Sequence, residues 1–302
     1  MENNQPRPKR ILSIDGGGIR GIIPLCILKE IELQTKKMPV EMFDFMAGTS
    51  TGAIISAALA CGNTASDTLD LYIELCQEVF RKDWKGFIGS FGSYKYSSVN
   101  AAAIYRDVIG NVSLNDLPVD ILLTAVRVND RKQWYFTNDS PANAKTTGNL
   151  SLADCVAASA AAPTFFSPYP IQGVGLCVDG GVGTSGNPVY QACIEAAQYR
   201  PEGEYPADTT LVFSLGTGFY DNYKIPKWWG DWVEWSLRTS LSNPIEQQSG
   251  LAREIYDHFS RFNPSLPHEI DMDDTSVVDE LVEIGKAEAL KTDWEAFWDN
   301  YS

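Results

Sequence analysis

The chain has 302 residues, of which 44% are hydrophobic and 21% charged, a composition typical of a globular protein. With 24 Lys and Arg against 39 Asp and Glu, its net charge is −15. This charge argues against a nucleic acid polymer as the main partner, because such polymers are held by clustered basic side chains. It also disfavours electrostatic adsorption to anionic lipid, so any membrane contact has to be largely apolar.

The N-terminal region carries no recognisable targeting signal. Residues 1–10 are polar, and the apolar run Ile11–Ile14 that follows is too short for a signal peptide. The longest small and apolar stretch, residues 52–62, is shorter than the ~20 residues of a membrane span. The six cysteines are scattered without a Cys-x-x-Cys motif, as expected for small buried side chains in a reducing compartment. The sequence therefore predicts a cytoplasmic protein.

Strand-like runs alternate with helical segments over the first two-thirds of the chain. The predicted strands are 10–14, 42–47, 121–128, 176–178 and 210–215, and the predicted helices are 19–37, 51–61, 152–161 and 187–198. Pro24 fits this pattern only if it lies in the first turn of its helix. The alternation predicts a three-layer α/β/α fold, with helices on both faces of a mostly parallel central sheet.

The last third of the sequence changes character. Helices are predicted at 245–262 and 276–301, after a stretch in which Trp228, Trp232 and Trp235 share one helical face. Such a stripe indicates either core packing or an interfacial patch or lid. We expect one domain spanning residues 1–302, with an α/β core over 7–219 and a helical extension over 226–302 packed on it.

A glycine-rich loop follows the first predicted strand, where Asp15–Gly21 reads DGGGIRG. Consecutive glycines let bare N–H groups approach a ligand, and the start of a helix favours negative charge there. The loop fits an oxyanion hole for acyl transfer. It also fits a dinucleotide cradle, because Gly16, Gly18 and Gly21 match G-x-G-x-x-G. A tight strand-to-helix turn is the third interpretation.

A second motif, Gly48–Gly52, reads GTSTG and lies between a predicted strand and a helix of small residues. The G-x-S-x-G pattern in this context is typical of a nucleophile elbow, in which a sharp turn exposes the serine oxygen. The motif therefore favours Ser50 as a nucleophile, and the alternative is a serine that only caps the helix.

Neither histidine of the sequence is placed to act as the general base that would activate Ser50. His258 is expected in a helix and His268 in a loop, neither at a strand end where triad bases of α/β sheets lie. The base is then a carboxylate, a lysine or water. Asp179 ends a predicted strand and is followed by Gly180 and Gly181, so its carboxylate is a candidate acceptor for the hydroxyl proton. Taken alone, this Asp-Gly pair would indicate a turn.

In this order, GGGIRG, GTSTG and DGG resemble the patatin-like phospholipases, lipid acyl hydrolases that use a Ser-Asp dyad without histidine. Further similar segments extend the resemblance over nearly the whole chain: Ala162–Phe166, Asn187–Pro188, Ser214–Gly218, Arg261–Pro264 and Leu281–Gly285.

The resemblance implies a role for each motif. Ser50 is the nucleophile and Asp179 the acid/base. Gly16, Gly17, Gly18 and Arg20 form the oxyanion hole, and Gly48, Gly52, Gly180 and Gly181 support the turns. A dinucleotide cradle is disfavoured, because it needs an acidic residue at the end of the second strand, whereas Asp44 is expected inside that strand.

The resemblance also implies cleavage of fatty-acyl esters of membrane phospholipids at a membrane surface, without a metal or cofactor. In compact bacterial members it implies activation by a cyclic di- or oligonucleotide in antiphage defence, which is compatible with oligomerisation on activation. The alternative class is a catalytically silent patatin-like module that senses a lipid or a nucleotide. The intact Ser50 and Asp179 argue against that alternative.

Overall fold

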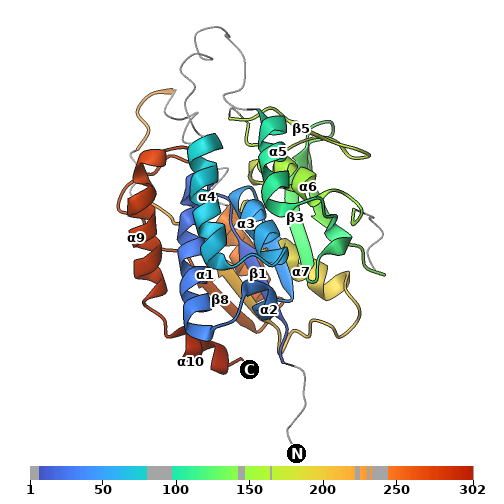
Figure 1. The fold of residues 1–302 in the computed structure, drawn as a ribbon, viewed down its shortest axis with the longest axis vertical. Coiled ribbons are helices and arrows are strands. Elements are labelled where there is room, and N and C mark those ends of the chain that lie inside the picture. Colours follow the sequence, from blue (N-terminus) through green and yellow to red (C-terminus); the bar gives the residue numbers. More distant parts are fainter. Residues whose placement is uncertain are drawn as a thin grey trace, which may run out of the picture.

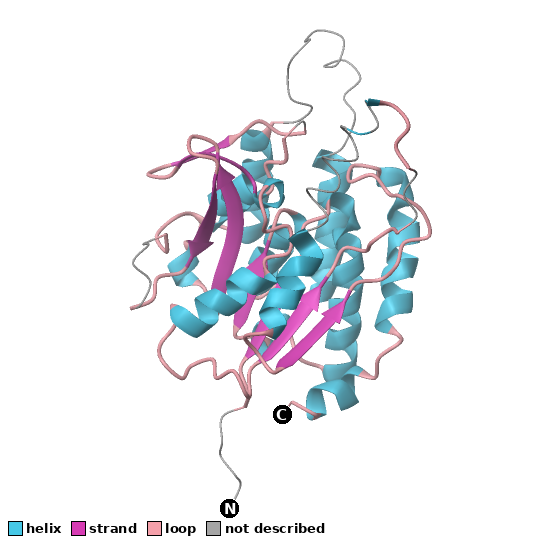
Figure 2. Cartoon of the chain, turned by 180° about the vertical axis from the view of Figure 1, so that it is seen from behind, coloured by secondary structure: helices cyan, strands magenta, loops and turns pink. Residues whose placement is uncertain are grey.

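The computed structural model describes residues 7–79, 97–141, 147–163, 165–221, 225–229, 232 and 244–301. These residues form an eight-stranded sheet between two layers of helices (Figure 1 and, from behind, Figure 2). Seven strands follow the order β5-β6-β3-β2-β1-β7-β8, and β4 pairs with β3 off this path. The strands are β1 (Arg10–Ile14), β2 (Phe45–Gly48), β3 (Asp120–Arg127), β4 (Lys132–Thr137), β5 (Tyr169–Ile171), β6 (Gly175–Asp179), β7 (Leu211–Leu215) and β8 (His258–Phe262).

The centre of the sheet is parallel, as the β/α alternation predicts. β1 pairs in parallel with β2 and β7, β2 with β3, and β7 with β8. β4 and β6 pair antiparallel with β3, and β5 with β6. The mostly parallel three-layer architecture is thus confirmed. The sequence analysis did not predict β4, β5 or β8.

Helices cover both faces of the sheet. They are α1 (Ile22–Thr35), α2 (Pro39–Met42), α3 (Thr51–Ala60), α4 (Ala65–Val79), α5 (Ser98–Ile109), α6 (Leu152–Ser159), α7 (Val189–Gln198), α9 (Val278–Ala289) and α10 (Trp294–Asp299). Residues 244–253 are also helical. Pro24 lies in the first turn of α1, where its missing N–H costs nothing.

Alternation along the strands divides the apolar side chains between two cores. In β1, Leu12 and Ile14 join the larger core under α1 and α3, whereas Ile11 joins a smaller core under α7. β7 repeats this pattern, with Phe213 in the larger core and Val212 in the smaller one. Because successive side chains point into different cores, the central strands β1 and β7 are buried along their whole length.

The C-terminal region differs from its prediction. The helix expected over 245–262 stops at residue 253, and His258–Phe262 forms β8 beside β7. The helix expected over 276–301 is divided into α9 and α10, with Asp293 capping α10. Trp294 of α10 is fully buried and meets the rings of Phe213 and Phe262 edge-on, so the chain end packs on the sheet.

The second strand begins later than predicted. The segment 39–42 is a short helix, α2, and β2 starts only at Phe45. Asp44 therefore lies before the strand rather than inside it, where it accepts the Arg10 N–H at 2.9 Å and pairs with Arg7 and Lys9.

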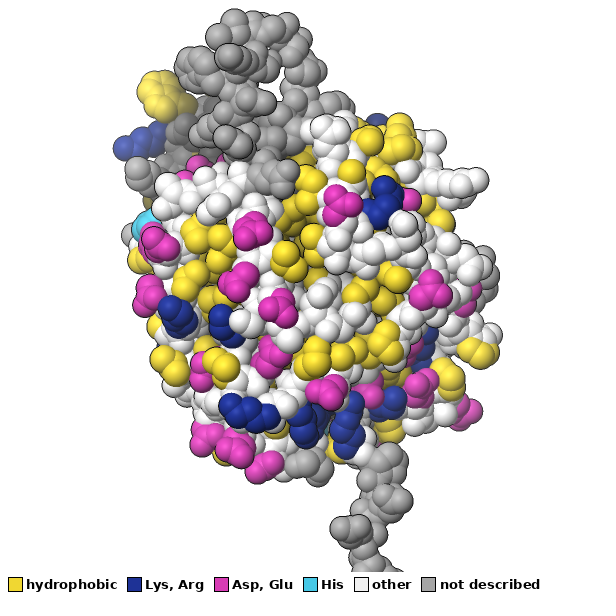
Figure 3. Space-filling view, in the orientation of Figure 1, with side chains coloured by type: hydrophobic (Ala, Val, Ile, Leu, Met, Phe, Trp, Pro, Cys, Tyr) yellow, Lys and Arg dark blue, Asp and Glu magenta, His cyan; other side chains and the backbone are white. Residues whose placement is uncertain are grey.

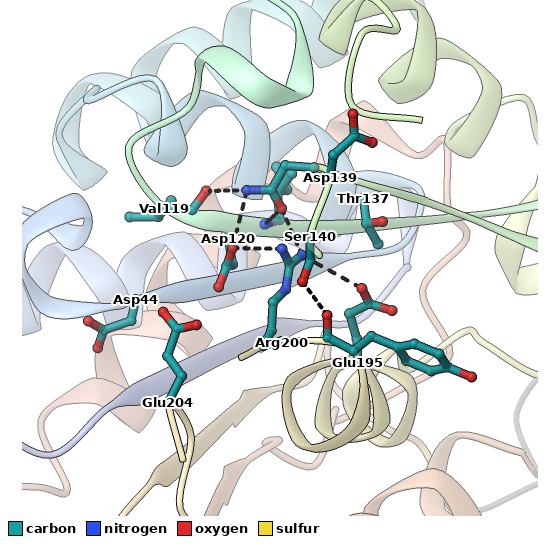
Figure 4. A network of polar contacts seen from close by, with 12 residues as sticks. Asp44, Val119, Asp120, Thr137, Asp139, Ser140, Glu195, Arg200 and Glu204 are labelled. Carbon is teal, nitrogen blue, oxygen red and sulfur yellow. Dashed lines mark hydrogen bonds and ion pairs between the residues drawn. The ribbon is translucent and has the colours of Figure 1, made fainter. Parts of the chain in front are cut away.

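A buried polar network lies at the amino end of β3, away from the candidate active site (Figure 4). The guanidinium of Arg200 contacts Asp120 at 3.0 Å, Asn138 at 2.8 Å and Glu195 of α7 at 3.7 Å. Asp120 also accepts the Tyr205 hydroxyl at 2.6 Å. Because the Arg200 guanidinium is paired with the carboxylates of Asp120 and Glu195, the network links α7 to β3 and has a structural role.

Candidate active site

Two strands meet end to end along one edge of β3. β4 occupies the other edge, so β2 and β6 have to share this one. β2 stops with Gly48 opposite Leu123, and β6, running the opposite way, stops with Asp179 opposite Ala125. Only Thr124 separates the two end points in the register. This topology brings the carboxyl ends of both strands to one place, and with them the candidate dyad of Ser50, just after β2, and Asp179, the last residue of β6.

Ser50 lies in the sharp turn between β2 and α3. Its backbone has φ +56° and ψ −120°, a conformation that residues with a side chain rarely adopt. The turn is possible because Gly48 and Gly52 cross closely: a Cβ on Gly48 would lie 2.1 Å from the Gly52 carbonyl oxygen. The strand, the strained serine and the small-residue helix have the geometry of a nucleophile elbow.

The Ser50 backbone is tied down by a neighbouring helix. Its N–H donates to the Oγ of Ser159, the last residue of α6, at 3.0 Å. The sequence analysis missed Ser159, because a single buried serine in an alanine-rich helix gives no local signal.

Asp179 is buried beside Ser50. Its Oδ1 accepts the Gly181 N–H at 2.8 Å, in the turn that starts with Gly180. Burial raises the pKa of Asp179 from 3.8 to about 6, although hydrogen bonds with the Ser50 side chain and the Gly181 amide act in the opposite direction. At neutral pH the carboxylate is thus ionised, but it is far more basic than an exposed aspartate.

The glycine-rich loop is held by its carbonyl groups. Thr217 donates its hydroxyl to the Gly16 carbonyl at 2.9 Å, and Arg20 Nε donates to the Gly17 carbonyl at 3.3 Å. Because a trans peptide is planar, its N–H points away from its C=O, so these bonds also orient the amides of Gly17 and Gly18. Within the described part of the chain, these two amides donate to no acceptor.

The structure narrows the predicted set of oxyanion donors. The Gly16 N–H donates to the Gly186 carbonyl at 2.9 Å, so this amide is engaged within the fold. Gly16 instead lets the loop pass beside Ser50, whose Cβ would lie 3.3 Å from a Cβ at this position. Gly17 and Gly18 remain as candidate donors. Arg20, which the resemblance places in the oxyanion hole, donates its side-chain N–H to the Gly17 carbonyl and so steadies the loop.

Two contacts with the C-terminal third of the chain fix the ends of this loop. Asp15, which opens it, forms a two-point ion pair with Arg261 of β8 at 2.7 and 3.3 Å. Farther along, the Ile19 N–H donates to the Met272 carbonyl at 2.9 Å. The C-terminal third of the chain therefore supports the loop, a contribution that the motifs alone did not indicate.

Gly18, Ser50 and Asp179 line one cavity. Its other walls are mainly apolar and come from α3, α4, α5, the segment after α6 and Met272; they include Ile54, Leu75, Phe165 and Phe166. A reactive serine at the polar end of an apolar cavity suits a substrate with a polar reacting group and an apolar chain.

Both histidines lie elsewhere. His258 is the first residue of β8 rather than a helix residue, so it lies at the amino edge of the sheet, opposite to Ser50. His268 lies in a loop, as predicted, and contacts Glu280 at 2.9 Å. Neither lines the cavity. In the described segments we also find no cluster of His, Cys, Asp or Glu that could hold a metal ion.

Part of the tryptophan stripe is visible. Trp228 and Trp232 are 75% and 49% exposed, and the neighbouring Trp229 is 83% exposed, so the core-packing interpretation is wrong for these residues. Trp235 lies outside the described residues. None of the described helices is long and apolar enough to cross a membrane.

Comparisons with known proteins agree with this geometry. Residues 12–193, well over half of the chain, match the patatin-like phospholipase family. A cGAMP-activated phospholipase of Escherichia coli (strain TW11681) is 25% identical over 295 residues, covering 88% of this chain and 83% of its own. Patatin-like protein 2 of Arabidopsis thaliana is 28% identical over 281 residues, covering 79% of this chain and 69% of its own.

Among solved structures, VipD of Legionella pneumophila superposes with a TM-score of 0.53 at 14% identity. The match covers 95% of this chain but only 66% of VipD, so the chain spans slightly less than two-thirds of that protein. At this identity, the likeness concerns the fold.

Proposed function

The chain belongs to the patatin-like phospholipase family, and from this membership and the site geometry we propose that it hydrolyses fatty-acyl esters of membrane phospholipids through a Ser50–Asp179 dyad. One observation carries the proposal. A serine in a strained elbow and a buried aspartate of raised pKa lie at two strand ends that meet on one edge of β3.

In the proposed reaction, Ser50 Oγ attacks the ester carbonyl carbon while Asp179 accepts its proton. The tetrahedral intermediate collapses when Asp179 returns this proton to the leaving alcohol, which leaves an acyl group on Ser50. Asp179 then takes a proton from water, the resulting nucleophile attacks the acyl carbon, and the fatty acid departs as Ser50 regains its proton. A base with a pKa of about 6 suits this exchange near neutral pH.

The amides of Gly17 and Gly18 are the proposed donors to the negative charge that develops on the carbonyl oxygen. Their orientation is set before substrate arrives by the bonds that Thr217 and Arg20 make to the loop. Such preorganised donors stabilise a transition state without rearrangement during the reaction. No metal or organic cofactor enters this scheme.

An acyl chain fits the apolar walls of the cavity, and this supports a lipid substrate. We propose that the protein meets the bilayer peripherally and from the cytosol. On the face shown in Figure 3, Lys and Arg gather mainly near the N-terminal segment, whereas acidic side chains are spread widely. The exposed Ile225, Trp228 and Trp229 provide apolar side chains for an interface where charge attraction is weak.

Regulation by a cyclic nucleotide is proposed from the relatives. Proteins of Escherichia coli (strain TW11681) and Vibrio cholerae serotype O1 that resemble this chain are named cGAMP-activated phospholipases. We propose a similar activator, a cyclic di- or oligonucleotide, with a role in antiphage defence and oligomerisation on activation. The competing proposal, a catalytically silent sensing module, is disfavoured because the elbow, the buried aspartate and the oriented amides are all present.

The decisive experiment compares wild type with Ser50→Ala in two assays: labelling by a fluorophosphonate probe, and release of fatty acid from phospholipid vesicles with and without cGAMP. Ser50→Ala should lose both activities while keeping its thermal melt. Ser56→Ala, a change at a buried serine that does not line the cavity, should keep both. If Ser50→Ala still hydrolysed ester, the nucleophile assignment would be wrong. A wild type that binds cGAMP or vesicles but neither labels nor hydrolyses would favour the sensing module.

A further inference from the structure

One helix end contacts the main chain of both dyad residues. The Oγ of Ser159, at the end of α6, accepts the Ser50 N–H at 3.0 Å. Two residues later, the Ala161 carbonyl accepts the Asp179 N–H, also at 3.0 Å. Ser50 follows β2 and Asp179 ends β6, two strands that run in opposite directions, and this short segment links the two residues directly.

The bond to Ser159 compensates for a strained backbone. Ser50 has φ +56°, and a conformation of this kind costs on the order of 1–3 kcal/mol, so the surroundings have to hold it in place. The Ser50 N–H precedes α3 and has no partner inside that helix, as is usual at helix starts. Ser159 is fully buried, so its oxygen is shielded from solvent, and its loss would leave the Ser50 N–H without this acceptor.

The composition of the helix end allows this close approach. Residues 157–162 read AASAAA, and their short side chains let the α6 backbone lie directly against the two strand ends. Ala160 and Ala162 line the cavity, so the segment that holds the dyad also forms a wall of the site.

We infer that Ser159 is a positioning residue, which together with the Ala161 carbonyl fixes Ser50 relative to Asp179. This inference rests on the proposed function of these two residues. Ser159 itself does not line the cavity, so it acts through the Ser50 backbone and not on the substrate. Its loss should therefore slow the chemical step and leave substrate affinity nearly unchanged.

The test is Ser159→Ala, with Ser56→Ala as the matched control. Ser56 is equally buried, lies on α3 after the elbow and donates its hydroxyl to the Ala47 carbonyl at 3.1 Å, so each change removes one hydrogen bond of a fully buried serine. For Ser159→Ala we expect kcat on a soluble p-nitrophenyl ester to fall about 10²-fold with KM unchanged, because small displacements of a nucleophile cost about this much. The rate of fluorophosphonate labelling should fall in parallel. Ser56→Ala should keep both rates even if its melting temperature drops.

Two further variants separate the acceptor from the packing. Ser159→Thr keeps the oxygen acceptor and should keep most of kcat. Ser159→Cys keeps nearly the volume but offers only a weak sulfur acceptor, so it should behave like Ser159→Ala and serves in its place if that variant does not fold.

A folded Ser159→Ala or Ser159→Cys with wild-type kcat and labelling rate would overturn the inference. So would equal activity losses in Ser159→Ala and Ser56→Ala, because they would reflect stability alone. Failure of the proposed function looks different: either Ser50→Ala would still be labelled and turn over ester, or wild type itself would show neither labelling nor turnover, whatever the Ser159 variants do.

Discussion

Replacing Asp179 with Asn should abolish turnover and stabilise the protein at the same time. The amide cannot accept the serine proton, but its oxygen can still accept the Gly181 N–H that the carboxylate now accepts. The gain in stability follows from burial, since a rise of the Asp179 pKa from 3.8 to about 6 means that folding opposes ionisation. The shift corresponds to about 3 kcal/mol of unfolding free energy.

The size of this stability difference depends on pH in a defined way. Below pH 3.8 the Asp179 carboxyl is protonated in the folded and the unfolded chain, so wild type and variant should be equally stable. Between 3.8 and about 6 the unfolded chain ionises first, which destabilises wild type only. Above pH 6 the difference should stay constant, with Asp179→Asn melting roughly 6 °C higher.

The assay is a series of thermal melts from pH 4 to pH 8 for both proteins, with Asp130→Asn as a control of opposite sign. Hydrogen bonding to Arg127 lowers the pKa of Asp130 to about 2, so this carboxylate stabilises the fold when charged. Asp130→Asn should therefore be less stable than wild type throughout this pH range, because the stabilisation is lost only as the pH falls below 3.8 toward the folded-state pKa of about 2. If Asp179→Asn were no more stable than wild type at pH 8, burial would not destabilise the charged carboxylate. Burial could then not be the cause of a raised Asp179 pKa.

Three other predictions concern catalysis on a soluble ester. The value of kcat/KM should fall tenfold per unit as pH drops below the Asp179 pKa of about 6, and a flat profile down to pH 5 would exclude this carboxylate as the base. Gly17→Ala places a Cβ 2.2 Å from Thr217 Oγ1, so the loop has to shift. Steady-state kinetics should show kcat lowered by about 10²–10³ with little change in KM, and a folded variant with wild-type kcat would remove the oxyanion role. Arg20→Ala should lower kcat on phospholipid and on p-nitrophenyl ester alike, because its guanidinium holds the Gly17 carbonyl; a loss confined to phospholipid would indicate head-group contact instead.

The β/α alternation predicted the parallel centre of the sheet, and the motifs indicated Gly18, Ser50 and Asp179, which line the cavity. Local patterns suffice there, because an elbow and a glycine loop are encoded by adjacent residues. The way in which Asp179 reaches Ser50 could not be predicted from β/α alternation, which implies parallel strands. β6 is antiparallel and meets β2 end to end, and this depends on pairing with β3 far along the chain.

The misassigned β8 has a similar explanation. Its side chains are all partly buried, so His258–Phe262 lacks the clear apolar alternation of a strand, and in the sequence it reads as a continuation of the preceding helix. What stabilises it is long-range: pairing with β7, and the ion pair of Arg261 with Asp15. Ser159 escaped notice for the same reason, since its partner lies 109 residues away.

The end-to-end meeting of β2 and β6 also sets the order in which activity can appear during synthesis. A chain that has emerged only to residue 160 contains Ser50 and the glycine loop but not Asp179 or the strand that bears it. Pairings between such distant segments form slowly, because the chain loses the entropy of closing a long loop before the stabilising contacts can form. In the proposed mechanism, a nascent chain therefore has a serine without its base, and ester hydrolysis begins only when the sheet is complete.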